Sequence, residues 1–101
     1  MAATVDVNLD ATFSVTTDEL NEFLRERDAE KPCDACGHTV EWFMRAAPNG
    51  KPVISFTGVY SDPSKAELHF SLFCPNCGHV RLFYAPYVAN VIVDMRRRNN
   101  G

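Results

Sequence analysis

Apolar and polar residues alternate along the first part of the chain, from Val5 to Val15. A period of two is typical of a strand that has one face on a core and the other in water. We therefore expect residues 5–15 to form a half-buried strand, which a turn near Asn8 to Asp10 divides in two. Chain ends are often poorly ordered, so a mobile N-terminal segment is the alternative.

The next stretch changes to a helical pattern. Thr16-Thr17-Asp18-Glu19 has the spacing of a capping box, in which a threonine and a glutamate each satisfy a backbone amide of the first turn. We expect a helix that begins at Thr16 and ends by Lys31, because Pro32 disfavours helix in the residue before it. The apolar positions on one face of this helix are Leu20, Phe23 and Leu24.

Strand patterns return in the middle of the chain. Alternation from Val40 to Ala46, the turn Pro48-Asn49-Gly50-Lys51 and a returning strand from Val53 to Tyr60 predict a β-hairpin, since Asn-Gly is favoured in tight hairpin turns. We expect a loop over residues 61–65. A third strand follows, with an apolar row formed by Leu68, Phe70 and Leu72.

The last part of the chain predicts one more strand and one more helix. Residues from Val80 to Tyr84 alternate, and Pro86 ends that strand. From Tyr87 onward, apolar residues recur at helical spacing, although the β-branched run at residues 91–93 suits a strand better. Together the patterns predict an α+β fold: an N-terminal strand segment and helix, an antiparallel sheet of three to four strands, and a C-terminal helix.

All the cysteines of the chain, which number four, fall in two matching hexapeptides. In each, two thiols lie two residues apart and a glycine follows, which supplies a sharp turn because positive φ costs glycine little. Two such pairs provide four soft ligands, the set that a structural tetrahedral zinc site prefers. The hexapeptides are Cys33-Asp34-Ala35-Cys36-Gly37-His38 and Cys74-Pro75-Asn76-Cys77-Gly78-His79.

These paired motifs resemble the zinc-ribbon family, and the resemblance covers roughly Lys31 to Tyr84. It implies two knuckles at the ends of β-hairpins that clamp one zinc ion per chain between them. It identifies a scaffold better than a function, because function depends on sites added to a fold. The implied metal ligands are Cys33, Cys36, Cys74 and Cys77.

Four thiolates complete a tetrahedral shell and leave no position for water, so we expect no enzymatic activity. Backbone amides that follow the second cysteine of each pair can hydrogen-bond to the sulfurs. These amides belong to Gly37, His38, Gly78 and His79. Two alternatives remain: a histidine that replaces one cysteine, and a rubredoxin-like iron site that carries electrons.

Length and charge narrow the class of protein. With 101 residues and 46% hydrophobic content, we expect one domain over residues 1–101. The net charge of −3 is unevenly spread: eight acidic and two basic side chains precede Lys31, whereas four arginines and one aspartate follow Gly78.

The first residues carry no secretory signal pattern and no stretch is long enough to span a membrane, so we expect a cytoplasmic protein with reduced thiols. Disulfides are the alternative for the cysteines.

We therefore expect a protein-interaction or regulatory module with structural zinc. Nucleic-acid binding is the alternative, although the negative charge does not favour it. Phe43, Phe73 and Phe83 are expected on the sheet face opposite the main apolar row, where a helix or a partner covers them. Oligomeric state is left open. The basic candidates for an interaction surface are Arg81, Arg96, Arg97 and Arg98.

Overall fold

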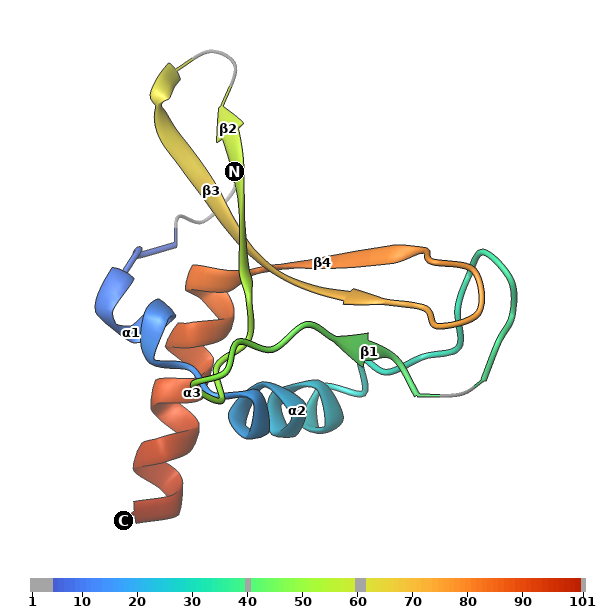
Figure 1. Ribbon diagram of the computed structural model, residues 1–101. Coiled ribbons are helices and arrows are strands. Elements are labelled where there is room, and N and C mark those ends of the chain that lie inside the picture. The colour runs from blue at the N-terminus through green and yellow to red at the C-terminus, as the bar shows by residue number, and fades with distance from the viewer. Residues whose placement is uncertain (1–4, 40, 60–61, 101) are drawn as a thin grey trace, which may run out of the picture.

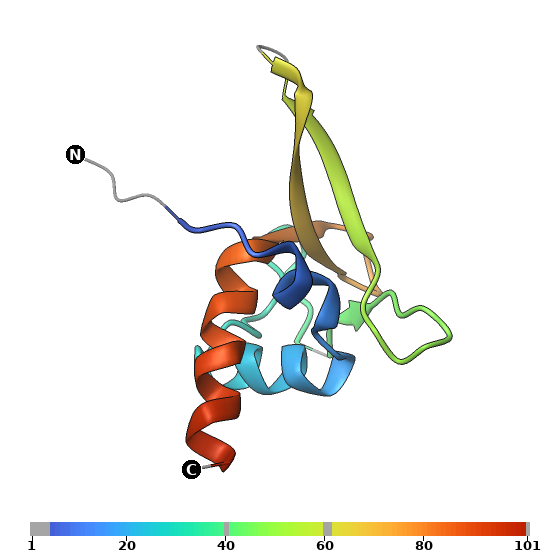
Figure 2. The ribbon, with the colours of Figure 1, turned by 90° about the vertical axis from the view of Figure 1, so that its left-hand side faces the viewer.

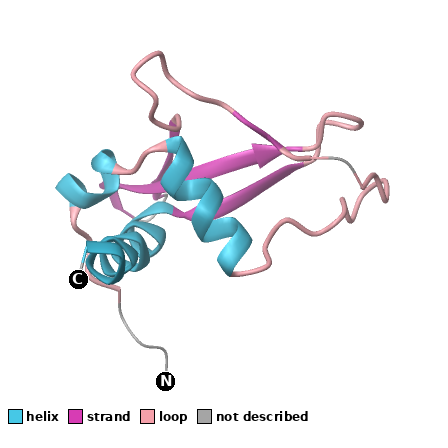
Figure 3. Cartoon of the chain, turned by 90° about the horizontal axis from the view of Figure 1, so that it is seen from below, coloured by secondary structure: helices cyan, strands magenta, loops and turns pink. Residues whose placement is uncertain are grey.

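The computed structural model of the protein describes residues 5–39, 41–59 and 62–100 (Figure 1). These residues form an α+β fold with a four-stranded antiparallel sheet and with helices toward both ends of the chain, which confirms the predicted fold class. The helices lie on one side of the strands (Figure 3), and β2 and β3 extend away from them as a paired ribbon (Figure 2). In chain order the elements are α1 Leu9–Ser14, α2 Thr17–Glu26, β1 Phe43–Met44, β2 Ile54–Val59, β3 Asp62–Phe73, β4 Val80–Tyr84 and α3 Ala85–Asn100.

The strand predicted over residues 5–15 is wrong, because residues 9–14 form helix α1. Asn8 caps this helix: its Oδ1 accepts a hydrogen bond from the Ala11 amide at 3.0 Å, and its carbonyl accepts one from the Thr12 hydroxyl at 2.8 Å. Ala11, Thr12 and Val15 are buried, whereas Leu9 and Phe13 are 53% and 44% exposed. The cap and the burial of α1 against α3 outweigh the period of two in the sequence.

Helix α2 has the predicted capping box. The Thr16 amide donates to Glu19 Oε1 at 3.0 Å, and the Glu19 amide donates to Thr16 Oγ1 at 3.2 Å. The helix ends at Glu26, before the limit that Pro32 sets. Its buried side chains are Leu20, Phe23 and Leu24, as the spacing predicted.

Strand β3 pairs with every other strand of the sheet. Along one edge it pairs with β4, from His69↔Tyr84 to Phe73↔Val80. Both β1 and β2 lie on the opposite edge, because each of them pairs with β3 residues that also pair with β4. The two knuckles therefore lie at the same end of β3, close to β1 and to the start of β4.

The hairpin predicted between residues 40–46 and 53–60 forms only beside its turn, where the Ala47 amide donates to the Lys51 carbonyl at 2.8 Å and the Val53 amide donates to the Arg45 carbonyl at 2.9 Å. Gly50 has a φ of 77°, as a tight turn requires. Pairing between the two arms stops after the bridge between Ala46 and Pro52, because β1 and β2 run in the same direction along one edge of β3 and each pairs with β3 instead. β1 and β2 thus follow one another along β3 and do not pair with each other.

Two other boundaries differ from the prediction. Residues 62–65 were expected in a loop but belong to β3, which pairs with β2 up to Val59↔Asp62. Proline is tolerated near the start of a strand, so Pro63 does not prevent this. Helix α3 begins at Ala85, directly after β4, and contains the β-branched run at residues 91–93. Residues 40, 60 and 61, which the predicted strands and loop include, lie outside the described residues.

Phe83 does not lie on the face where the sequence placed it. It pairs with Phe70 in the antiparallel register, so both side chains point to the core face, where Phe83 packs partly buried. Phe43 and Phe73 do lie opposite that face, and their rings meet edge to face with centroids 5.5 Å apart. Buried residues of β3 and the helices form the core, among them Leu20, Leu24, Leu68, Phe70, Leu72, Val88, Ala89, Ile92 and Met95.

Arg96 joins the three helices. Its Nε and Nη2 donate to the Glu19 carboxylate at 2.5 and 2.8 Å, and Nη2 also donates to the Ser14 hydroxyl at 3.1 Å. This hydrogen bond from Arg96 lowers the pKa of Glu19. Arg98 is paired with Glu26 at 3.0 Å, whereas Arg97 is 78% exposed and 3.5 Å from Asp94.

We expect Glu19→Gln to lower the free energy of unfolding by about 1 to 2 kcal/mol near pH 7, after allowance for solvent screening. Glutamine can still serve the capping box, so the loss reports the charged pair with Arg96. Because the folded pKa of Glu19 is lowered, its contribution is present above the ordinary glutamate pKa and is lost as pH falls through the folded value.

Urea unfolding at several pH values measures this effect, and the difference between the two proteins should shrink as the pH is lowered. Arg97→Ala is the matched control and should change the unfolding free energy by less than about 0.5 kcal/mol. A Glu19→Gln protein as stable as the control at pH 7 would contradict the assignment.

Candidate metal centre

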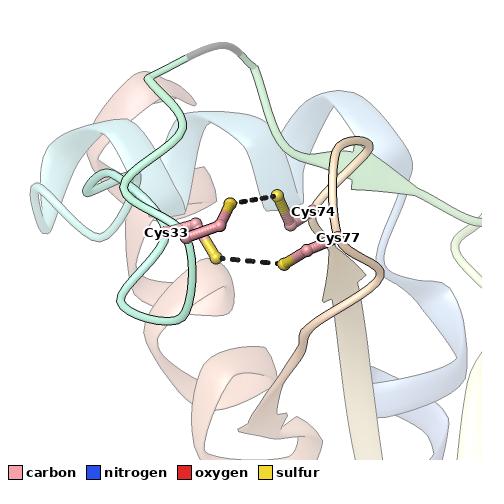
Figure 4. A group of neighbouring side chains, drawn as sticks. Cys33, Cys74 and Cys77 are labelled. Atoms are coloured by element: carbon pink, nitrogen blue, oxygen red, sulfur yellow. Dashed lines mark hydrogen bonds between the residues drawn. The ribbon is translucent and has the colours of Figure 1, made fainter.

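The two hexapeptides bring all the thiols of the chain together. Among the described residues, the four cysteine sulfurs lie within 4.8 Å of one another. Cys33 Sγ is 3.7 Å from Cys77 Sγ, and Cys36 Sγ is 3.7 Å from Cys74 Sγ, so each close pair joins one knuckle to the other (Figure 4). A disulfide would need about 2.05 Å, and all four thiols are free.

These separations fit a tetrahedral ion. With a zinc to sulfur distance of about 2.3 Å, two ligands of a regular tetrahedron lie about 3.8 Å apart. The 3.7 Å separations match this value. The cluster can hold a metal ion, and an ion bound to all four sulfurs would have no coordination position left for water.

The two knuckles have the same backbone conformation. In the first, the Gly37 amide donates to the Cys33 carbonyl at 2.7 Å; in the second, the Gly78 amide donates to the Cys74 carbonyl at 2.8 Å. Gly37 and Gly78 have φ values of 75° and 80°, which glycine adopts at little cost. The glycine amides thus close the turns and do not reach the sulfurs.

Other donors do reach the sulfurs of the second cysteines. The backbone amides of His38 and His79 hydrogen-bond to Cys36 and Cys77. The Asn76 side-chain amide donates to Cys36 Sγ at 3.4 Å, across from the other knuckle. Asn76 was not identified from the sequence, because only the closure of the two knuckles brings it beside Cys36.

Two thiols of the cluster, those of Cys36 and Cys77, differ in how readily they ionise. The Asn76 amide, and then the His38 backbone amide, lower the pKa of Cys36 to about 6. The His79 amide lowers the pKa of Cys77, but lost hydration and the neighbouring thiols outweigh it and raise that pKa to about 12. Like charges this close oppose full ionisation, and a bound dication would remove that opposition.

Burial is uneven within each pair. Cys33 and Cys74 are 3% and 2% exposed, whereas Cys36 and Cys77 are exposed. The histidine rings lie outside the sulfur cluster as the structure describes it. His79 instead packs edge to face on Trp42, with ring centroids 6.4 Å apart.

The proposed surface residues fall into two groups. The Arg81 side chain is 17% exposed and contacts the Lys31 and Pro32 carbonyls and the Asp34 carboxylate, just as Arg96 is engaged with Glu19. Phe43, by contrast, is 53% exposed on the outer face of the sheet.

Three further apolar side chains lie on the outer face and were missed from the sequence. They are Val80, Leu82 and Tyr84, which are 51%, 55% and 36% exposed. The pairing Phe73↔Val80 turns them outward, because it sets even-numbered residues of β4 opposite odd-numbered residues of β3. The feature of the sequence that could have revealed this orientation is the length of the second knuckle, because that length fixes the pairing of Phe73 with Val80.

Comparison with protein-family models, with curated proteins and with solved structures found no match to this chain. The four-cysteine cluster beside the antiparallel sheet is compatible with a metal-binding site. Every helix in the described ranges is too short or too polar to cross a membrane.

We expect the reduced, metal-free chain to bind one Co²⁺ ion, with the absorption bands of tetrahedral thiolate coordination. Cys33→Ser and Cys74→Ser should each lose these bands, because a serine hydroxyl stays protonated and is a poor ligand for a soft site. His38→Ala and His79→Ala are matched controls and should keep them. A histidine variant that loses the bands while a cysteine variant retains them would overturn the ligand set.

Proposed function

We propose that this chain is a zinc-stabilised protein-binding module, in which one zinc ion on Cys33, Cys36, Cys74 and Cys77 is structural. The observation that carries this proposal is the cluster of four free sulfurs within 4.8 Å of one another, with two separations of 3.7 Å between the knuckles. Thiolate ligands favour zinc over harder cations, and a complete set of four protein ligands is characteristic of structural sites. The zinc would hold the β3–β4 hairpin against the segment between α2 and β1.

The size of the domain supports a structural role for the metal. Folded domains of this size keep only about 5 to 15 kcal/mol of net stability. Structural zinc contributes about 10 to 16 kcal/mol of apparent binding free energy in small peptides near pH 7. The ion would therefore account for as much free energy as the whole domain retains.

The outer face of the sheet supports a binding role. We define the outer patch as Phe43, Phe73, Val80, Leu82 and Tyr84, which lie on β1, β3 and β4. In an antiparallel sheet that packs on helices, the outer face is ordinarily polar. An apolar patch there is a feature of surfaces that bind other proteins.

The metal cluster and the outer patch are adjacent in the chain. Phe73 immediately precedes Cys74, and Val80 follows His79 at the end of the second knuckle. β1, which follows the first knuckle and carries Phe43, pairs with Phe73 at the start of the second knuckle. Loss of the ion would separate β1 from the hairpin, so we expect docking to require the metal.

We expect removal of the metal by a chelator to unfold the domain. Circular dichroism should lose its ordered signal, and readdition of Zn²⁺ under reducing conditions should restore it. Metal analysis of the freshly purified chain should find one zinc per chain and little iron. An unchanged spectrum and melting temperature after complete removal of zinc would overturn the structural role.

We expect Leu82→Glu to abolish partner binding while leaving the fold intact, because Leu82 is 55% exposed and a carboxylate there disfavours an apolar contact. Affinity purification from the native host, followed by calorimetry with each purified candidate, measures this. Lys51→Glu on the loop beyond β1 is the matched control. A partner that binds Leu82→Glu as tightly as the original chain would exclude the outer patch, and salt-sensitive binding to nucleic acid alone would exclude a protein partner.

A further inference from the structure

The two knuckles are held in different ways. The second knuckle, residues 74–79, lies between β3 and β4, whose pairing at Phe73↔Val80 fixes both of its ends. The first knuckle, residues 33–38, lies between the end of α2 and the two-residue strand β1. Among the described residues from 27 to 42, none belongs to a strand. Something other than a ladder must hold the first knuckle against the second.

Arg81 makes contacts that do this. It lies on β4, and its guanidinium donates to the Lys31 carbonyl at 3.1 Å and to the Pro32 carbonyl at 2.8 Å. A longer contact of 3.5 Å reaches the Ala29 carbonyl. Nη2 also lies 3.3 Å from the Asp34 carboxylate, within the knuckle itself. One side chain thus binds the chain on both sides of Cys33.

Trp42 completes the contact. The Arg81 guanidinium carbon lies 4.0 Å from the centre of the Trp42 ring, a cation–π geometry. Trp42 Nε1 donates to the Lys31 carbonyl at 2.8 Å, so this carbonyl accepts from both side chains. Trp42 is 9% exposed, which shields the contact from water. The ring and the guanidinium together fix the segment that enters the first knuckle.

We infer that Arg81 is a positioning residue for the metal centre: it docks the first knuckle onto the second and thereby sets how long a bound ion is retained. This inference rests on the proposed structural metal site. Arg81 does not bind a sulfur; it acts through residues 31–34, which place Cys33 opposite Cys77. The first knuckle is consequently the side that opens when Arg81 is lost.

The chemistry of arginine suits this role. A guanidinium presents five donors in a fixed plane, so it can serve several carbonyls while its face stacks on a ring. A lysine ammonium is a point charge without a planar face, so it cannot both donate to several carbonyls and stack on a ring. Arg81→Lys should therefore restore only part of what Arg81→Ala loses.

The experiment compares zinc-loaded original chain, Arg81→Ala and Arg81→Lys, with Arg97→Ala as the matched control. Zinc transfer to a colorimetric chelator gives the rate of release. We expect Arg81→Ala to release zinc about 10-fold to 100-fold faster, the range for loss of groups that orient metal ligands. Arg81→Lys should fall between it and the original chain, and Arg97→Ala should match the original.

Cysteine alkylation, followed residue by residue by mass spectrometry on the same zinc-loaded proteins, separates positioning from general stability. In Arg81→Ala we expect Cys33 and Cys36 to be modified well before Cys74 and Cys77. General destabilisation would instead expose all four together, and that result would overturn the inference. Trp42→Phe keeps a ring but removes the Nε1 donor, so it tests the same contact if Arg81→Ala does not fold, and it should show the same order of modification.

Failure of the inference can be told from failure of the proposed function. If the original chain binds no zinc, the structural metal site is wrong and the role of Arg81 is wrong with it. If the original chain binds zinc but Arg81→Ala matches Arg97→Ala in release rate and in the order of alkylation, only the role of Arg81 is wrong.

Discussion

The pairing of Phe73 with Val80 across the second knuckle is the constraint on which the rest of the structure depends. It decides which side of β4 faces the helices, because a shift of one residue would reverse every side chain of the strand. In the observed register Phe83 points into the core and Arg81 reaches the first knuckle, while Leu82 points outward. The core, the metal cluster and the outer patch therefore have a common geometric origin.

The same register carries through to the helices. α3 begins at Ala85, directly after the last residue of β4, so no loop separates the direction of the strand from that of the helix. Three turns further on, Arg96 meets Glu19 at the N-terminus of α2. The turn at the cysteines and the ion pair that joins the helices lie at opposite ends of one continuous β4–α3 segment.

Much of this was predictable where the information is local. Thr16 and Glu19 cap α2 through contacts three residues apart, and the cysteine spacing alone indicated one cluster. The errors arose where a distant contact decided the outcome. Residues 9–14 alternate like a strand but are capped by Asn8 and buried as a helix, and the hairpin that Asn-Gly begins stays short because β1 and β2 each pair with β3. The face of Phe83 depended on a pairing that periodicity within one strand cannot supply.

The ribbon of β2 and β3 divides the molecule into regions of different local stability. β4 accompanies β3 only from His69 onward, so the part of the ribbon beyond it has two strands, and Phe56 is 66% exposed there. An apolar hollow of about 250 Å³ separates Phe56 from Phe13 of α1. Two-stranded ribbons are marginal without a third layer, so this end opens at the lowest free-energy cost. Its backbone amides would exchange with solvent through local opening, before those of β3 in the part where β4 also pairs with it.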